Sequence, residues 1–167
     1  MGPRPLSRCR RRIRAGGLGQ VPASRPPAGY FEWARCRWRD LLLIRAEAAR
    51  QAALLWAFGT LIGNTDLHNG NLSFVTDHGR PYELAPAYDM TPMGFAPRSG
   101  GGLPDALPAA SLHAAVANES WRDAAQLAGE FLARVRAERR FSRRFAPCIA
   151  ALKNHLLVAG EKIQRLG

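Results

Sequence analysis

The sequence predicts an α+β fold that is predominantly α-helical, with one short β-hairpin. Apolar residues recur at helical spacing over about residues 41–61, 120–138 and 142–166. Between the first two of these stretches, residues 72–84 form two short apolar runs separated by a turn sequence, a pattern typical of a hairpin. Hydrophobic residues make up 47% of the chain, which is enough for a core. We therefore expect one folded domain over residues 40–167.

Residues 1–39 are a basic segment rich in Arg, Pro and Gly, and we expect them to be a disordered extension. Residues 1–29 contain no acidic residue and no sustained apolar period, so they cannot bury enough surface to offset the entropy of ordering. Arginines 8–14 could bind nucleic acid electrostatically, but no aromatic residue lies among them, which favours a solvated tail. A displaced start or reading frame is a third interpretation.

The charge, the cysteines and the hydropathy of the chain limit the classes of protein to which it can belong. The net charge of +11 comes mainly from residues 1–50, which hold twelve arginines and three acids. Cys9, Cys36 and Cys148 are widely spaced without a Cys-x-x-Cys pair, which indicates reduced thiols rather than a disulfide framework or zinc site. The longest apolar run, residues 52–63, is shorter than the roughly 20 residues that span a bilayer. These features predict a cytoplasmic protein with no membrane partner.

The first helix is expected from about Leu41 to Leu61, with Asp40 as its N-cap. Gly63 and Asn64 are expected to end it, because both residue types tolerate left-handed backbone geometry. Its apolar residues form one stripe that is expected to face the core: Leu41, Ile44, Ala48, Ala52, Leu55, Trp56 and Leu61.

The predicted hairpin pairs residues 72–75 with 81–84 across a turn at 76–79. It carries the chain out and back, so that Asp89 is expected to arrive beside Asn71. Pro86 and Pro92 flank Tyr88-Asp89-Met90 and should keep that segment out of regular helix. Residues 93–109, which include Gly100-Gly101-Gly102, are expected to be a loop. A flexible connection is favoured over a mobile lid, and no P-loop sequence is present.

Two helices are expected to complete the domain. Ser120 and Asp123 resemble a capping box at the start of a helix that ends near Glu138. A last helix is expected from about Ser142 to Leu166. The inward residues of the two helices are predicted to be Trp121, Ala125, Leu127, Phe131, Leu132, Val135, Phe145, Ile149, Leu152, Leu156 and Ile163. The arginines between positions 134 and 144 are interpreted as a solvated face, with an anionic partner as the alternative.

Asp66, Asn71 and Asp89 form the candidate site. An acid, an amide five residues later and a second acid returned by a hairpin are the groups that phosphoryl transfer needs. One carboxylate can take the proton of the attacking hydroxyl, while the amide and the second carboxylate can hold Mg²⁺ on nucleotide phosphates. Asp66 and Asn71 alone could be turn-forming residues, but the order of helix, loop, hairpin and second acid favours a nucleotide-phosphate site. Metal-assisted hydrolysis by Asp66, His68 and Asp89 ranks lower, because no second histidine lies at ligand spacing.

One family carries the same motifs. Leu61-Ile62-Gly63-Asn64-Thr65-Asp66-x-His68-x-x-Asn71-x-Ser73, followed by Tyr82-x-Leu84-x-Pro86-x-Tyr88-Asp89, resembles the protein-kinase-like C-terminal lobe of HipA-like serine/threonine kinases. These kinases are bacterial toxins of type II toxin–antitoxin systems and their relatives. The resemblance covers roughly residues 40–167 and is strongest over 55–92.

The resemblance implies roles for individual residues. Asp66 would be the catalytic base, and Asn71 and Asp89 would hold Mg²⁺. The residues implied to contact ATP are His68, Asn69, Gly70, Asn71, Tyr88 and Asp89. The implied partners are a protein substrate with a Ser or Thr acceptor and an antitoxin-like DNA-binding protein.

The chain also departs from a complete kinase of this family. The lysine that contacts the phosphates is absent, because the only lysines are Lys153 and Lys162. We therefore expect the 167-residue chain by itself to bind ATP poorly and to transfer little phosphate. The alternative function is an inactive remnant or interaction module that binds a partner protein or nucleic acid through its arginines.

Overall fold

The computed structural model describes residues 11–14, 43–77 and 79–166. These residues combine helices with a small antiparallel sheet, in agreement with the predicted α+β class. The chain divides into two compact units, one comprising Met1–Ala49 with His68–Tyr88 and the other Arg50–Leu67 with Asp89–Gly167. None of the helices in the described ranges has the length and apolarity needed to cross a bilayer.

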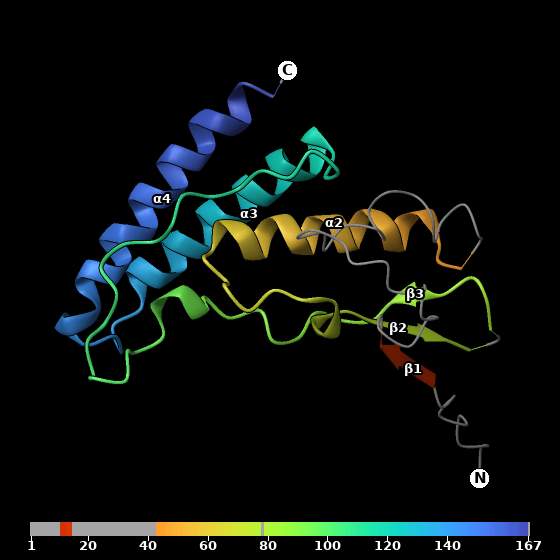
Figure 1. Cartoon of the computed structure of the whole chain (residues 1–167), viewed down its shortest axis with the longest axis horizontal. Helices are drawn as coiled ribbons and strands as arrows, with labels where there is room; N and C mark the ends of the chain where they lie inside the picture. The colour runs from red at the N-terminus through yellow and green to blue at the C-terminus, as the bar shows by residue number, and fades with distance from the viewer. Residues whose placement is uncertain (1–10, 15–42, 78, 167) are drawn as a thin grey trace, which may run out of the picture. The chain divides into compact units, whose positions relative to one another are not determined.

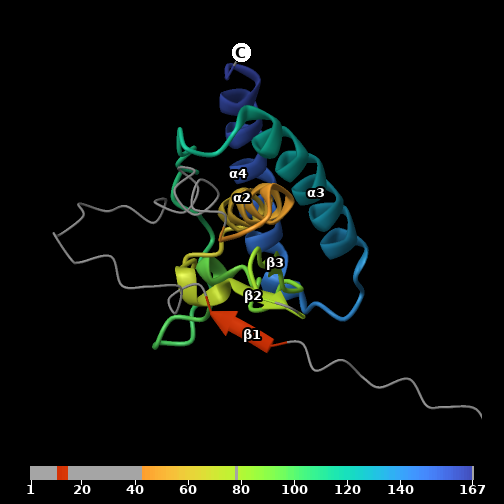
Figure 2. The same cartoon turned by 90° about the vertical axis from the view of Figure 1, so that its right-hand side faces the viewer.

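The first unit contains a three-stranded antiparallel sheet in the order β1 (Arg11–Arg14), β2 (Ser73–Thr76) and β3 (Glu83–Leu84) (Figure 2). The β2–β3 register places Phe74 opposite Leu84, so the predicted hairpin is confirmed, with β2 one residue later and β3 shorter than expected. Phe74 is fully buried, and its β2 neighbours Ser73 and Val75 are also buried. Because successive side chains of a strand point to opposite faces, both faces of β2 are buried.

Strand β1 departs from the expectation of disorder at four residues. Arg11–Arg14 pairs along the whole of β2, with Ile13 opposite Phe74. The open edge of β2 supplies backbone hydrogen bonds to this strand, a stabilising term that a composition argument does not consider. The remainder of segment 1–39 and the expected N-cap Asp40 lie outside the described residues.

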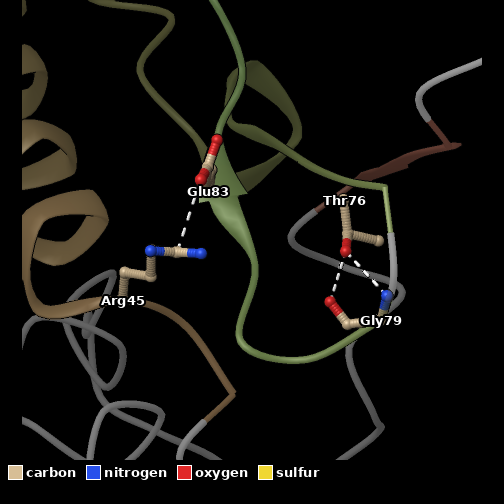
Figure 3. A network of polar contacts seen from close by, with 4 residues as sticks. All are labelled: Arg45, Thr76, Gly79 and Glu83. Atoms are coloured by element: carbon tan, nitrogen blue, oxygen red, sulfur yellow. Dashed lines mark hydrogen bonds and ion pairs between the residues drawn. The ribbon is translucent and has the colours of Figure 1, made fainter. Parts of the chain in front are cut away.

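The hairpin turn is closed by the Thr76 hydroxyl (Figure 3). Its Oγ1 accepts a hydrogen bond from the Gly79 N–H at 2.8 Å and donates one to the Gly79 carbonyl. Gly79 has φ +98°, a conformation that favours glycine. Arg45 Nε lies 3.3 Å from Glu83 Oε1 in the same view, but both side chains are about half exposed, so this ion pair contributes little stability.

The predicted helix start near Leu41 is wrong. Tyr82 N–H donates to the Leu43 carbonyl at 2.8 Å, and Arg45 N–H donates to the Tyr82 carbonyl at 3.0 Å. Residues 43–45 therefore pair with the hairpin as an extended segment, and helix α2 runs over Ala46–Leu61. Leu43 and Ile44 are both buried there. Tertiary pairing of the backbone overrides the helical pattern of these apolar residues.

Helix α2 buries Ala48, Ala52 and Leu61 of the predicted stripe, whereas Leu55 and Trp56 are only partly buried. Ala57, which was not predicted to face the core, is also buried. Gly63 ends the helix with φ +77°, and the Asn64 N–H donates to the Gly59 carbonyl at 2.9 Å. This backbone bond is typical of a glycine-terminated helix. The predicted helix end at Gly63 and Asn64 is confirmed, and of the two only Gly63 adopts the left-handed conformation.

The second unit contains the helical pair α3 (Asn118–Ala137) and α4 (Ala146–Gln164) (Figure 1). The pair is antiparallel, because the Asn118 side-chain amide at the start of α3 donates to the Leu166 carbonyl just after α4. The residues that these two helices bury are Trp121, Ala124, Ala128, Cys148, Leu152, His155, Ala159 and Ile163.

Three details of this pair differ from the prediction. Helix α3 begins with Ala117 as its N-cap and has no side-chain cap, so the capping box of Ser120 and Asp123 is wrong. Leu127, predicted to face inward, is 41% exposed. Helix α4 starts four residues after the predicted Ser142, because the short 3-10 helix η4 (Arg143–Phe145) precedes it.

The loop from residue 93 to 109 is fastened to the second unit at several points. Gly94, in the 3-10 helix η3 (Met93–Phe95), donates its N–H to the Gly63 carbonyl at 2.8 Å. The Cys148 thiol donates to the Pro104 carbonyl at 3.1 Å, and burial raises the pKa of this thiol. The Gly100–Gly102 stretch is a tight turn, in which the Gly101 N–H donates to the Arg98 carbonyl at 2.7 Å. These bonds favour a fixed connection over a lid.

His155 on α4 is a buried histidine whose Nε2 has no hydrogen-bond partner among the described residues. Burial lowers its pKa, although the nearby carbonyls of Thr60 and Pro108 oppose this shift; Lys162 adds to it. A group of this kind binds a proton more readily in the unfolded chain than in the folded one.

We expect His155 to make the protein less stable as the pH falls below about 6.5, the ordinary pKa of histidine. From there down to the lowered pKa of the folded state, the unfolded chain binds more protons, so the free energy of unfolding decreases by at most about 1.4 kcal/mol per pH unit. Urea unfolding at pH 7.5, 6.5 and 5.5 should show a smaller decrease for His155→Gln. The matched control His113→Gln replaces an exposed histidine and should keep the parental decrease. Equal pH dependence in all three proteins would contradict the prediction.

Candidate functional site

The candidate residues divide between the two units. Asp66 and Asp89 belong to the second unit, whereas the segment His68–Asn71 and Tyr88 belong to the first. The chain passes from one unit to the other at Leu67–His68 and again at Tyr88–Asp89, so both crossings lie directly beside a candidate residue. Each unit holds its candidate residues in a hydrogen-bond network of its own.

In the second unit, Asn64 connects the segments that carry the two acids. Its Oδ1 accepts a hydrogen bond from the Asp66 N–H at 3.0 Å, and its Nδ2 donates to the Asp89 carbonyl at 3.4 Å. The Asn64 side chain is buried, with 5% exposure. An amide presents both a donor and an acceptor, so one side chain can bond both the adjacent Asp66 segment and a segment 25 residues further along the chain.

Close packing at Gly59 holds the same two segments together. A Cβ atom at this position would lie 2.8 Å from Leu67 Cδ2 and 3.0 Å from Met90 Sδ, so a larger residue would force these side chains to shift. Leu67 follows Asp66 and Met90 follows Asp89. The residues beside the two acids therefore meet on one point of helix α2, and Asp66 and Asp89 are anchored to the same place in this unit.

Asp89 has an unusual backbone conformation. Its φ of +55° makes it the only non-glycine residue with positive φ in the described part of the chain. Such conformations cost energy and persist where surrounding contacts enforce them, often at functional sites. Its segment lies outside any helix, as Pro86 and Pro92 predicted. The Asp66 and Asp89 side chains are both exposed. Their carboxylates are therefore accessible to a ligand.

In the first unit, His68, Gly70 and Asn71 form a compact loop around the 3-10 helix η2 (Asn69–Asn71). The His68 N–H donates to Asn71 Oδ1 at 2.9 Å, and the Gly70 N–H donates to His68 Nδ1 at the same distance. Asn71 is 7% exposed. Its amide is thus oriented by the backbone three residues before it, as a pre-positioned ligand would require.

Tyr88 fastens this loop to the sheet. Its hydroxyl donates to the Gly70 carbonyl at 2.5 Å and lies 2.9 Å from Ser73 Oγ, at the start of β2. Ser73 is almost fully buried. The structure therefore gives Tyr88 a positioning role for the loop, whereas the sequence implied only a nucleotide contact.

The donor atoms suit a hard cation better than zinc. The described residues contain no cluster of three or more His, Cys, Asp or Glu side chains that could enclose a metal. His68 Nδ1 already accepts the Gly70 N–H, so only its Nε2 could bind a metal in the hydrolysis considered for Asp66, His68 and Asp89. Mg²⁺ is commonly held by one or two carboxylates together with substrate phosphates and water. Asn71 in the first unit and Asp89 in the second each carry oxygen atoms of this kind.

Asn64 connects the segments of the two acids, a role that the sequence does not predict. The sequence predicts only that Gly63 and Asn64 end the helix, because both residue types tolerate left-handed backbone geometry. The position of Asn64 two residues before Asp66 was the available signal, since Asn side chains often bond a backbone N–H two residues on. Its bond to the Asp89 segment could not be anticipated, because the distance along the chain is too long for local geometry to decide.

Comparisons with known proteins point to one family. Residues 34–156 match the family of HipA-like C-terminal domains. A relative is Toxin YjjJ of Escherichia coli strain K12, which is 36% identical over 139 residues. The match covers 83% of this chain but only 31% of the relative, so the chain spans about a third of that protein's length. No solved structure matches the chain significantly.

Proposed function

The chain belongs to the HipA-like C-terminal domain family, and from this premise we propose that it carries the base-and-metal part of a serine/threonine kinase. The reaction would be ATP- and Mg²⁺-dependent transfer of a phosphoryl group to a Ser or Thr hydroxyl of a protein. For the fold, we propose that the chain corresponds to the C-terminal lobe of such a kinase.

The single observation that carries the proposal is the Asn64 bridge between the Asp66 and Asp89 segments. Phosphoryl transfer depends mainly on positioning and on electrostatic stabilisation, so its acids must be held in a defined relation to each other. A buried amide that bonds both segments, with packing at Gly59 beneath them, supplies that rigidity. A turn-forming Asp66 would need no such connection to a second acid.

Each residue then has a stated role. Asp66 accepts the proton of the attacking hydroxyl, and its exposed carboxylate is accessible to a protein acceptor. Asp89 and Asn71 provide oxygen ligands for Mg²⁺, which when bound would neutralise charge on the phosphates. The loop of His68, Asn69, Gly70 and Asn71 would contact the nucleotide, with Tyr88 holding the loop against β2.

A toxin role is part of the proposal, since the curated relative is named a toxin. A toxin of a toxin–antitoxin pair is matched by an antitoxin, so we propose an antitoxin-like, DNA-binding partner for the whole protein. The phosphoacceptor would be a protein with an accessible Ser or Thr. A cytoplasmic location would place the protein with such substrates.

The test is binding of ATP to the 167-residue chain with and without Mg²⁺. Binding is measured as the shift in the melting temperature of the chain. We expect a small upward shift that needs both ligands, because ATP at about five times its Kd adds only about 1 kcal/mol of stability. Asp89→Asn should abolish the shift, whereas Asp105→Asn, which replaces an exposed carboxylate in the 93–109 loop, should retain it.

The same experiment distinguishes the proposed function from the alternative one. The chain has no lysine before Lys153 that could hold the phosphates, so weak binding is expected from this chain alone. A shift that survives Asp89→Asn, or no shift even at millimolar Mg²⁺–ATP, would favour an inactive interaction module.

A further inference from the structure

The junction of α3 and α4 carries a dense cluster of positive charge. We call it the arginine surface, and its residues are Arg134, Arg136, Arg139, Arg140, Arg143 and Arg144. Residues 134–144 contain these six arginines and one acid, Glu138, whereas the other residues from 51 to 167 hold six bases and nine acids. The positive charge of this part of the chain is therefore concentrated at a single place.

The arginine surface is exposed and largely unneutralised. All six side chains are exposed. Arg140 NH2 lies 2.7 Å from Glu138 Oε2, and this hydrogen bond lowers the pKa of Glu138. The other five arginines form no ion pair with an acid in the described part of the second unit. Their charges remain available to an anionic partner.

Helix stability does not account for the whole cluster. Arg134 and Arg136 lie in the last turn of α3, where the helix dipole favours cations. Arg143 and Arg144 lie immediately before α4, where the dipole disfavours them. Two adjacent cations at a helix start are slightly unfavourable, so helix stability does not explain Arg143 and Arg144.

An aromatic side chain lies among these arginines. Phe141 is 43% exposed and stacks on Phe145, with ring centroids 4.9 Å apart and planes at 19°. Phe145 in turn meets Phe95 edge-to-face at 6.3 Å, and Phe95 belongs to a buried cluster with Cys148 and Leu152. Phe141 is therefore an exposed ring that is supported from the core, rather than a loose side chain.

We propose that the arginine surface together with Phe141 binds single-stranded nucleic acid. Guanidinium groups match the geometry of phosphate oxygens, and an exposed, supported ring offers a face on which an unpaired base can stack. An acidic peptide would pair with the arginines but would give Phe141 no partner. A duplex keeps its bases stacked inside, so it could use the charges but not the ring. The binding site is distinct from the candidate kinase site and does not depend on phosphoryl transfer.

The test is fluorescence anisotropy with labelled 12-nucleotide single strands of RNA and DNA and with a duplex of the same sequence. The unmodified 167-residue chain should bind the single strands more tightly than the duplex. Phe141→Ala should weaken single-strand binding about tenfold and leave duplex binding unchanged, and Phe141→Trp should restore it. The triple variant Arg139→Gln, Arg143→Gln, Arg144→Gln should reduce the slope of log affinity against log salt by roughly 2.

A matched triple variant controls for net charge. Both triple variants keep the arginines of the N-terminal segment, so any binding by that segment contributes equally to the two. Arg98→Gln, Arg122→Gln, Arg165→Gln removes the same charge from exposed positions elsewhere and should keep most of the affinity. Circular dichroism and melting temperature establish that each variant is folded. Equal loss in the two triple variants, an unchanged affinity in Phe141→Ala, or equally strong displacement by poly-glutamate would each overturn the proposal.

Discussion

Asp66→Asn is expected to lower the rate of phosphoryl transfer by about 10²–10⁴-fold, because the amide cannot accept the proton of the attacking hydroxyl. The Asn64 bridge uses the backbone N–H of Asp66 rather than its carboxylate, so the substitution leaves that hydrogen bond in place. The side chain is also exposed, and we expect the free energy of unfolding to change by less than about 0.5 kcal/mol. The measurement is single-turnover incorporation of labelled phosphate from Mg²⁺–ATP, followed over hours because the parental rate of this chain is expected to be low.

A comparison with Asp89→Asn separates the two proposed roles. Asp66→Asn removes the base and should keep the Mg²⁺-dependent shift of the melting temperature caused by ATP. Asp89→Asn removes a metal ligand and should abolish both this shift and phosphoryl transfer. Transfer by Asp66→Asn at the parental rate would remove Asp66 from the catalytic role. Loss of the ATP shift in Asp66→Asn, with Asp89→Asn unaffected, would reverse the two assignments.

Asn64→Ala is expected to reduce the free energy of unfolding by about 2 kcal/mol. The substitution leaves the Asp66 N–H and the Asp89 carbonyl without their buried partner. We also expect phosphoryl transfer to fall well beyond what the lost stability explains, because the two acids would no longer be held by one side chain. Urea unfolding gives the first quantity and the single-turnover assay the second, both at a temperature where the variant is fully folded.

A destabilising substitution away from these residues is the matched control. Ile163→Val removes one buried methyl group from α4 and should cost about 0.5–1.5 kcal/mol while leaving transfer unchanged. Asn64→Ser, which keeps a smaller hydrogen-bonding group, should recover part of the stability. If Asn64→Ala lost stability and kept the parental transfer rate, the bridge would be purely structural.

The helices and the hairpin were largely predictable, and their boundaries were not. Helical periodicity located α2, α3 and α4, because each helix buries one stripe of small and apolar residues. The start of α2 was misplaced because residues 43–45 pair with Tyr82, a contact made by a segment about 40 residues further along the chain. The start of α3 was misplaced because Ala117 precedes it without any side-chain cap. Strand β1 depends likewise on the edge offered by β2.

The sequence by itself determined the order of helix, acidic loop, hairpin and second acid, and the glycine at position 63 that ends α2 with positive φ. These features follow from local rules, since periodicity and backbone sterics act over a few residues. Only the tertiary structure decided that Asn64 bonds both acidic segments, that Leu67 and Met90 meet at Gly59, and that Phe141 is supported among the arginines. Each of these contacts joins side chains or backbone groups whose meeting depends on how the helices and loops pack, which no spacing along the chain specifies.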